Sequence, residues 1–324
     1  ITFHQGYGKS RYQINSKVMR SYLYAIVLIL STALFVSMIP GISNSGQSIL
    51  LSLQIPQNNA QIAGVQKYNI PPVGKNLATP NISARAVIIK DLTTDTILYQ
   101  KEAKVPLPIA STTKIMTALV ASEYFQPNSV LTVKNGVPVS GAKVGLIAGE
   151  NLSFRSLLYG MLLNSGNDAA YTIAENYPGG VLGVVSAMNK KAAQLKLSST
   201  RFENPAGFDN PKHFSSAQDL MVITEQALGN SQLVRIFATK ETDITSLDKK
   251  YKHQLRNLNR LLSQIQGVLG VKTGYTEAAK ENLVTLLERG GNKVLLVVLG
   301  SDDRFGETTR LIDWTYANFV WPSF

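Results

Sequence analysis

The pattern of apolar and polar positions divides the chain into a short N-terminal segment and a larger C-terminal region. Residues 21–39 (SYLYAIVLILSTALFVSMI) are almost wholly apolar and contain no charge. As a helix at ~1.5 Å per residue they reach roughly 29 Å, close to the hydrocarbon thickness of a bilayer. A surface helix would need a polar face, and a cleaved signal peptide usually has a shorter apolar stretch. We therefore predict one N-terminal transmembrane helix, with residues 21–42 as an anchor, and keep a signal peptide as the alternative.

The charges around this segment predict its orientation. No cation follows it before Lys67, and four precede it: Lys9, Arg11, Lys17 and Arg20. By the positive-inside rule, residues 1–20 are cytoplasmic and everything after the segment lies outside. Residues 43–80 are rich in Asn, Gln, Ser and Pro, which predicts a polar linker. The chain is then a single-pass membrane protein that binds the lipid bilayer through residues 21–39.

Beyond the linker, periods of two and of about 3.6 residues alternate along the chain. Residues 84–101 and 281–300 each predict two strands joined by a turn. Amphipathic spacing predicts helices over 111–125, 152–177 (broken at 164–167), 184–197, 215–228 and 307–320. Because strands lie at both ends of this region with helices between them, we predict an α+β fold over residues 81–324. It consists of a mainly antiparallel sheet flanked by helices, with an inserted all-helical subdomain.

Composition excludes several kinds of function. The chain contains no cysteine, which excludes disulfides, thiol catalysis and Cys-ligated zinc. Its three histidines (His4, His213 and His253) are far apart, and no H-E-x-x-H motif occurs, so we predict no metal and no other cofactor. The net charge of +11 suits a membrane surface or an anionic polymer. No basic run or nucleic-acid-binding motif occurs, so we expect no nucleic acid as a partner.

The stretch GVLGVKTGYT, residues 267–276, looks at first like a phosphate-binding loop. The pattern G-x-x-x-x-G-K-[ST] requires glycine immediately before the lysine and again five residues earlier. Those positions hold Val271 and Gln266. The spacing therefore excludes a nucleotide-binding loop of this kind, and Lys272 and Thr273 need another explanation.

A candidate nucleophile lies in the tetrapeptide Ser111-Thr-Thr-Lys114. Residues i and i+3 share one face of a helix, so the serine hydroxyl and the lysine amine can meet. Lysine activates a serine only when it is neutral, which desolvation or a second cation brings about. The motif alone occurs often by chance, but the G-x-S-x-G elbow of other serine hydrolases is absent.

Two further motifs follow in order, Ser165-Gly166-Asn167 and Lys272-Thr273-Gly274. S-x-x-K, Ser-x-Asn and K-T-G are together the signature of penicillin-binding proteins and class A β-lactamases. Their flanks are PIASTTKIMTALVA, LLNSGNDAAYTIAE, RFENPAGF and GVKTGYTEAAKENLV. On these residues the chain resembles the low-molecular-weight D-alanyl-D-alanine carboxypeptidases over about residues 82–320. The resemblance implies a β-lactamase/transpeptidase-like fold and a bacterial, extracytoplasmic catalytic domain.

The resemblance also implies catalytic roles. Ser111 would attack the carbonyl between the two terminal D-alanines of a peptidoglycan stem peptide, and Lys114 would accept its proton. Ser165 and Asn167 would relay protons and orient the substrate amide. The product of the first step would be a seryl acyl-enzyme that water hydrolyses, and β-lactams would be covalent inhibitors.

The third motif would bind the substrate. Lys272 and Thr273 would hold the free terminal carboxylate, because a charged group in a partly buried cleft needs a cation and a hydroxyl donor. Gly274 would let the substrate backbone approach the strand. The backbone N–H groups of Ser111 and Tyr275 would form the oxyanion hole.

Three other functions are compatible with this fold: two enzymatic activities and one non-catalytic role. A D,D-endopeptidase of this fold would carry the same motifs. A β-lactamase would need an additional glutamate, and the nearest candidate, Glu203, belongs instead to the carboxypeptidase-like flank RFENPAGF. A non-catalytic module that binds β-lactams or cell wall would be free to lose the nucleophile, whereas Ser111 is present. One departure from the family pattern is Lys280, which occupies a position where a small residue is usual.

Overall fold

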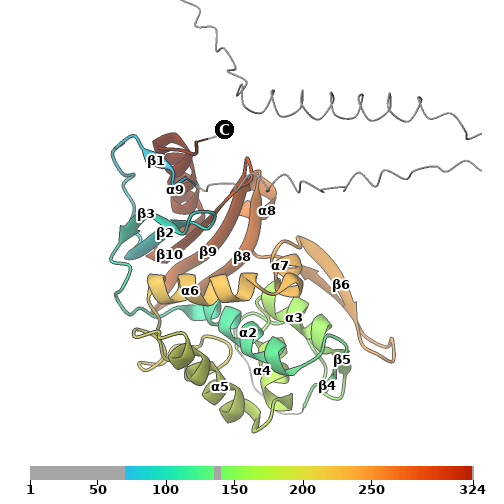
Figure 1. Cartoon of the computed structure of the whole chain (residues 1–324). Coiled ribbons are helices and arrows are strands. Elements are labelled where there is room, and N and C mark those ends of the chain that lie inside the picture. The colour runs from blue at the N-terminus through green and yellow to red at the C-terminus, as the bar shows by residue number, and fades with distance from the viewer. Residues whose placement is uncertain (1–69, 135–139, 323–324) are drawn as a thin grey trace, which may run out of the picture. The chain divides into compact units, whose positions relative to one another are not determined.

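A five-stranded antiparallel sheet organises the computed structural model, which describes residues 70–134 and 140–322 (Figure 1). The strand order is β3-β2-β10-β9-β8. The strands are β2 (Ala86–Asp91), β3 (Thr96–Lys101), β8 (Val268–Thr276), β9 (Lys280–Arg289) and β10 (Asn292–Ser301). Both predicted strand pairs are present, and β2 pairs with β10. The prediction of a sheet built from the two ends of the domain is therefore confirmed.

Helices cover both faces of this sheet, and the residue pattern of β10 shows why. Successive side chains of a strand point to opposite faces. In β10, Leu295 and Val297 pack in the core that includes α6 (Ala217–Leu228), whereas Leu296 and Val298 pack in the core that includes α9 (Arg304–Asn318). Burial on both sides explains why β10 is continuously apolar rather than alternating.

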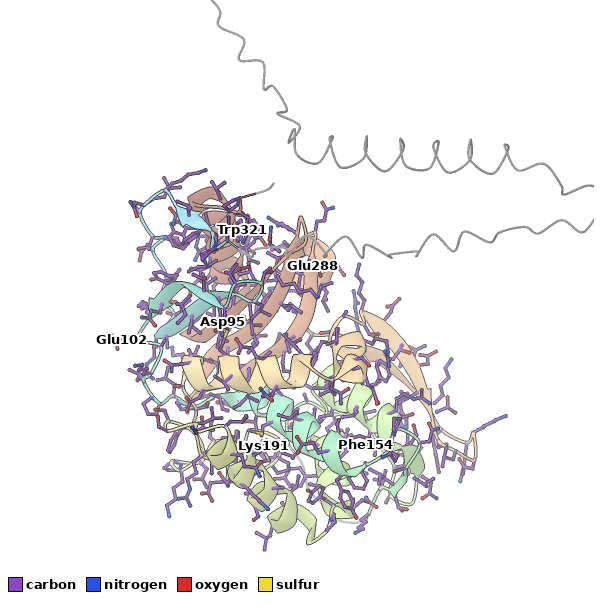
Figure 2. The ribbon with its side chains drawn as sticks, in the orientation of Figure 1. Asp95, Glu102, Phe154, Lys191, Glu288 and Trp321 are labelled. Carbon is purple, nitrogen blue, oxygen red and sulfur yellow. The ribbon has the colours of Figure 1, made fainter. Side chains whose placement is uncertain are left out.

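Most of the remaining helices form the inserted subdomain between β3 and β8, below the sheet in Figure 1, whereas α8 (Leu261–Gln264) packs in the core that includes α9. Its central helix, α2, is fully buried along most of its length. Figure 2 shows Phe154 among these helices, where it is 1% exposed, whereas Lys191 on the outer surface pairs with Glu123. The elements of the subdomain are η1 (Ala110–Thr113), α2 (Lys114–Tyr124), α3 (Phe154–Leu162), α4 (Asn167–Asn176), α5 (Gly180–Gln194) and α7 (Ser231–Phe237).

Two small two-stranded sheets in this region were not predicted from the sequence. One joins β4 (Val130–Thr132) to β5 (Asn151–Ser153), and the other joins β6 (Glu241–Thr245) to β7 (Lys252–Arg256). Strands β6 and β7 have the sequences ETDIT and KHQLR, and each buries only one side chain. A strand with a single buried apolar residue leaves no alternating pattern to detect.

The two ends of the described chain are tied together. β1 (Val73–Gly74) pairs with β11 (Phe319–Val320), and the Leu77 N–H donates to Asn318 Oδ1 at 2.8 Å. Part of the segment assigned to the linker over 43–80 therefore contacts the end of α9. The predicted anchor over residues 21–42 lies outside the described residues. Within residues 70–134 and 140–322, no helix is long and apolar enough to cross a membrane.

Candidate active site

Three distant segments meet at one cleft of about 370 Å³ between the sheet edge and the helical subdomain. Ser111 comes from η1, Ser165 and Asn167 come from the loop before α4 and its first turn, and Thr273 and Tyr275 come from β8. β8 is the edge strand of the sheet, so its outer side is free to face the helices. The structure thus brings together all three motifs that the sequence singled out.

The first motif places its serine and lysine in direct contact. Ser111 lies in the 3-10 turn η1, and Lys114 is the first residue of α2. Lys114 Nζ lies 2.8 Å from Ser111 Oγ, 2.8 Å from Asn167 Oδ1 and 2.7 Å from the carbonyl oxygen of Ala206. The backbone just before the nucleophile is strained, because Ala110 has φ +46°.

Lys114 is completely buried, and its pKa is well below the usual value. The main cause is desolvation of the ammonium, and the second is repulsion from Lys272. The carboxylate of Asp168 acts in the opposite direction. A neutral amine is therefore favoured next to the serine hydroxyl, which is the state in which lysine accepts a proton.

The second motif links the two lysines. Asn167 Nδ2 donates to the carbonyl of Ser140 at 2.6 Å, which turns Oδ1 toward Lys114. Ser165 has φ +56°, a left-handed conformation that is unusual for a residue other than glycine. It accepts a hydrogen bond of 3.0 Å at Oγ from Lys272 Nζ.

Lys272 has the second perturbed amine. It is 1% exposed and donates to Ser165 Oγ and, at 2.9 Å, to the carbonyl of Thr273. Burial and the nearby Arg304 lower the pKa of Lys272 to about 7. A bound anion beside Lys272 would raise this pKa again.

Gly274 is required where β8 passes the nucleophile. A side chain there would place Cβ 3.0 Å from the carbonyl oxygen of Ile109 and 3.2 Å from the backbone nitrogens of Ser111 and Thr112. The following residue, Tyr275, lines the cleft and is 60% exposed. The backbone of this strand can therefore lie beside that of Ser111, as an oxyanion hole would require.

The third partner of Lys114 comes from a turn in the stretch RFENPAGF, which the sequence indicated only as part of the family resemblance. Asn204 Oδ1 accepts from the backbone N–H groups of Ala206, Gly207 and Phe208, at 3.2, 2.7 and 2.9 Å. This turn presents the Ala206 carbonyl to Lys114. No side-chain motif could reveal it, because every residue carries a carbonyl group.

Arg304 is a second feature that the sequence did not reveal. It lines the cleft, and its Nη1 donates to the carbonyl of Gly274 at 3.0 Å. Arg304 is the first residue of α9, where a cation opposes the helix dipole. That unfavourable position is the one signal in the sequence that could have drawn attention to it.

The remaining polar candidates lie outside the reactive centre. His213 is buried against Thr113, with 2.7 Å between Nε2 and Oγ1, and desolvation lowers its pKa to about 4. His253 contacts Glu150, with 2.9 Å between Nε2 and Oε2. Within residues 70–134 and 140–322, no cluster of acidic and histidine side chains could hold a metal ion.

Lys280, the departure from the family pattern, lies at the turn between β8 and β9. Its φ of +55° is a conformation that favours glycine, which explains why a small residue is usual there. Its side chain is exposed and Nζ lies 3.3 Å from Asp302 Oδ1. Lys280 does not line the cleft.

Known proteins share this sequence and arrangement. Residues 74–303 match the family model described as D-alanyl-D-alanine carboxypeptidase. A D-alanyl-D-alanine carboxypeptidase of Mycobacterium tuberculosis is 34% identical over 77% of this chain and 87% of its own length. A D-alanyl-D-alanine endopeptidase of Pseudomonas aeruginosa is 30% identical over 82% of this chain and 87% of its own.

A solved structure and a further sequence relative agree with these matches. The crystal structure of the Streptomyces K15 DD-transpeptidase superposes with a TM-score of 0.70 and 31% identity, over 74% of this chain and all of the other. The D-alanyl-D-alanine carboxypeptidase DacF of Bacillus subtilis is 32% identical over 76% of this chain. The chain spans 65% of the length of that relative. The predicted family resemblance and the β-lactamase/transpeptidase-like α+β fold are therefore confirmed.

Proposed function

Because the chain belongs to the D-alanyl-D-alanine carboxypeptidase family of serine peptidases, we propose that it removes the terminal D-alanine from peptidoglycan stem pentapeptides. The observation that carries this proposal is the contact of 2.8 Å between a fully buried lysine amine, Lys114, and the hydroxyl of Ser111. The reaction would pass through an ester of Ser111 that water then hydrolyses. β-Lactams, which present a reactive amide of similar shape, would acylate the same oxygen.

The hydrogen bonds of Lys114 support its role as the base. A neutral amine has two N–H bonds and one lone pair, whereas amide carbonyl oxygens only accept hydrogen bonds. The carbonyl oxygens of Asn167 and Ala206 therefore use both N–H bonds of Lys114. The lone pair is left for the hydroxyl of Ser111, and it accepts that proton as the serine oxygen attacks.

The cations of the cleft support the choice of a substrate with a free carboxylate. Thr273 and Arg304 line the cleft, and the Lys272 amine donates to the Thr273 carbonyl and lies near enough to Arg304 for their charges to repel. Charge-assisted hydrogen bonds from such groups are the strong interactions that fix a carboxylate in place. Gly274 lets β8 pass close to the backbone of Ser111. A substrate backbone would lie along this strand, and the N–H groups of Ser111 and Tyr275 would stabilise the oxyanion.

The leaving D-alanine needs a proton on its nitrogen. Ser165 lines the cleft and accepts a hydrogen bond from Lys272, and Lys114 contacts both Ser111 and Asn167. We assign Ser165 the relay of a proton to the leaving amine, and Asn167 the orientation of both Lys114 and the substrate amide.

A fluorescent penicillin tests the nucleophile. Ser111→Ala should abolish covalent labelling, whereas the wild-type protein is labelled. Labelling that persists in the variant would disprove the assignment of Ser111. Loss of labelling in both proteins would instead favour a non-catalytic module.

The reaction products distinguish a D,D-carboxypeptidase from a D,D-endopeptidase. Carboxypeptidases and endopeptidases occur among the relatives at similar identity, so a D,D-endopeptidase is the competing proposal. The purified protein should be incubated with a stem pentapeptide and with a cross-linked muropeptide dimer, and the products analysed by mass. Release of one alanine from the pentapeptide, with the dimer intact, supports the carboxypeptidase; cleavage of the dimer supports the endopeptidase.

The sequence also supports a location for the protein. We propose that residues 21–39 anchor it in the bacterial cell membrane, with the catalytic domain outside, because cations cluster before this segment. Protease added to intact spheroplasts should then degrade the catalytic domain. Protection of that domain would reverse the proposed orientation.

A further inference from the structure

One wall of the cleft belongs to no helix or strand and is held by Asn167 and Asp168, the first two residues of α4. Ser140, Gly141 and Ala142 line the cleft, and we refer to residues 140–146 as the wall segment. No helix or strand includes these residues. Their position must therefore be set by contacts with neighbouring elements.

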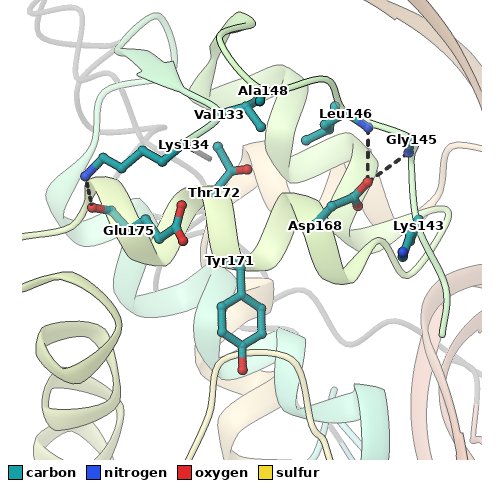
Figure 3. Close-up of a pocket in the computed structure, with 10 residues that line it drawn as sticks. All are labelled: Val133, Lys134, Lys143, Gly145, Leu146, Ala148, Asp168, Tyr171, Thr172 and Glu175. Carbon is teal, nitrogen blue, oxygen red and sulfur yellow. Dashed lines mark hydrogen bonds between the residues drawn. The ribbon is translucent and has the colours of Figure 1, made fainter. Parts of the chain in front are cut away.

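Asp168, the residue after the motif asparagine, supplies most of these contacts. Its Oδ2 accepts from the backbone N–H groups of Val144, Gly145 and Leu146 at 3.0, 2.8 and 3.1 Å, and Oδ1 also lies 3.0 Å from the Val144 nitrogen. Figure 3 shows the carboxylate directed at Gly145 and Leu146. Hydrogen bonds to an ionised acceptor are about twice as strong as those between neutral groups. Among the described residues, these three N–H groups donate to Asp168 and to no other acceptor.

Asn167 binds the same segment from the cleft side. Its backbone N–H donates to Ala142 O at 2.8 Å, and Nδ2 donates to Ser140 O at 2.6 Å. The second bond determines which way the amide faces, and hence whether Oδ1 points to Lys114. The wall segment and the orientation of Asn167 are therefore mutually dependent.

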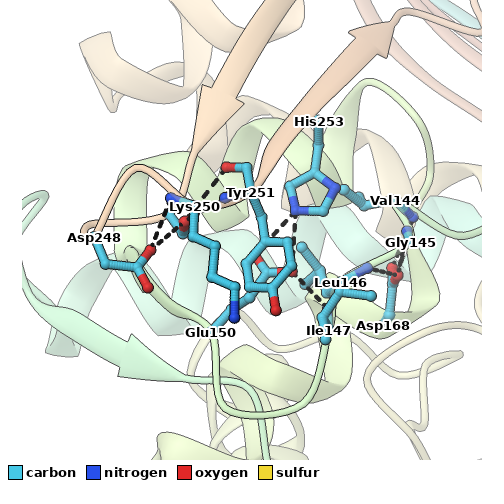
Figure 4. A network of polar contacts seen from close by, with 11 residues as sticks. Val144, Gly145, Leu146, Ile147, Glu150, Asp168, Asp248, Lys250, Tyr251 and His253 are labelled. Carbon is cyan, nitrogen blue, oxygen red and sulfur yellow. Dashed lines mark hydrogen bonds and ion pairs between the residues drawn. The ribbon is translucent and has the colours of Figure 1, made fainter.

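The far end of the loop has a separate attachment. The Ile147 N–H donates to Glu150 Oε1 at 2.7 Å, and Glu150 is in turn paired with His253 of β7 (Figure 4). This attachment begins one residue beyond the wall segment. It leaves Asp168 as the ionised group that binds the wall segment itself.

We propose that Asp168 is a positioning residue for the reaction: by fixing the wall segment, it holds the Asn167 amide in the orientation that aims Lys114 at Ser111. The route runs from the Asp168 carboxylate through the backbone of Val144–Leu146 to the Ser140 carbonyl, and from there through Asn167. The inference rests on the proposed acylation of Ser111, which it deepens.

A purely electrostatic role of Asp168 predicts the opposite result. Burial and Lys272 lower the pKa of Lys114, whereas the Asp168 carboxylate raises it. Removing only that charge would make Lys114 more readily neutral, and acylation near neutral pH would stay constant or accelerate. Loss of the wall contacts would slow acylation, so the sign of the change separates the two roles.

The test measures the rate of acylation of the full chain by a fluorescent penicillin, per protein molecule that becomes labelled. This rate does not depend on how much of a variant is folded. Asp168→Asn should slow acylation by about 10- to 100-fold, the effect of a reacting group displaced by about 1 Å. Glu175→Gln is the matched control, because it removes a carboxylate from the same helix, at the opposite end of the pocket in Figure 3, and should leave the rate unchanged.

A double-mutant cycle tests the route. If Asp168 acts through Asn167, Asp168→Asn should have little further effect in an Asn167→Ala background. Full additivity of the two effects, or an unchanged or faster acylation of Asp168→Asn, would overturn the proposal. If the wild-type protein is not labelled at all, the proposed function fails instead, so the two failures are distinguishable.

Discussion

Replacing Lys272 with methionine should stabilise the folded protein at acidic and neutral pH while it abolishes the proposed activity. Methionine fills a similar volume with an uncharged chain. Lys272 is 1% exposed, and burial with repulsion from Arg304 lowers its pKa from 10.5 to about 7. A pKa lowered by folding means that the protonated amine opposes the folded state.

The size of this effect follows from the shift. At about 1.4 kcal/mol per pKa unit, a shift of 10.5 − 7 = 3.5 units costs the folded state about 5 kcal/mol below pH 7. The variant also loses the hydrogen bonds to Ser165 Oγ and Thr273 O. At about 1–2 kcal/mol for each of these two unpaired acceptors, or about 2–4 kcal/mol together, the net gain at pH 6 should be about 1–3 kcal/mol.

The sign of the pH dependence is fixed by proton binding. Between pH 7 and 10.5, the unfolded chain binds a proton at Lys272 and the folded protein does not, so the stability of the wild type rises with pH. Lys272→Met removes this titration. The gain in the free energy of unfolding of the variant over the wild type should therefore be largest below pH 7 and should decrease by about 3 kcal/mol between pH 7 and pH 9.

Urea unfolding at pH 6 and pH 9 measures both quantities. Lys104→Met is the matched control, because Lys104 is exposed and its loss should change stability little at either pH. If the Lys272 variant exceeds the wild type in stability by the same amount at both pH values, the reasoning is refuted. A variant less stable than the wild type at pH 6 would refute it as well.

Two further substitutions test the surroundings of the site. Gly207→Ala would place Cβ 1.9 Å from the Ala110 carbonyl oxygen, so it should slow penicillin acylation at least about 10-fold. Gly180→Ala, also at positive φ but with no atom within 4 Å of its Cβ, should leave acylation unchanged; equal effects would refute the clash. Burial alone would raise the pKa of Glu307, but hydrogen bonds, first that from the Ser301 hydroxyl, lower it overall. This stability is lost as the pH falls, so Glu307→Gln should flatten the acid side of the unfolding profile, and an unchanged profile would count against it.

The sequence predicted those parts of the site that depend on side-chain type at a fixed local spacing. Ser111 and Lys114 are three residues apart at the start of a helix, and their contact follows from helix geometry. Strands β9 and β10 were evident because a long apolar hairpin has few other interpretations. Both successes rest on short-range patterns.

The parts that sequence reasoning missed act through the backbone or through unfavourable positions. The Ala206 carbonyl and the wall segment contribute groups that every residue possesses, so their identity leaves no signal. Arg304 comes next to the cleft only because α9 begins directly after β10, which lies two strands from the edge strand β8, and its side chain reaches the Gly274 carbonyl. Such contacts depend on the complete sheet order, which local patterns do not specify.

The need for neutral amines explains why no carboxylate in the described part of the chain contacts either buried lysine. Among the described residues, neither Lys114 nor Lys272 forms an ion pair; each is satisfied by hydroxyl, amide or backbone oxygens. Neutral acceptors hold an amine in place without favouring its charged form, whereas a contacting carboxylate would raise the pKa and keep Lys114 protonated. The nearby acid, Asp168, binds three backbone N–H groups instead. Its carboxylate thus orders the cleft wall without contacting Lys114, whose amine must lose its proton to act as the base.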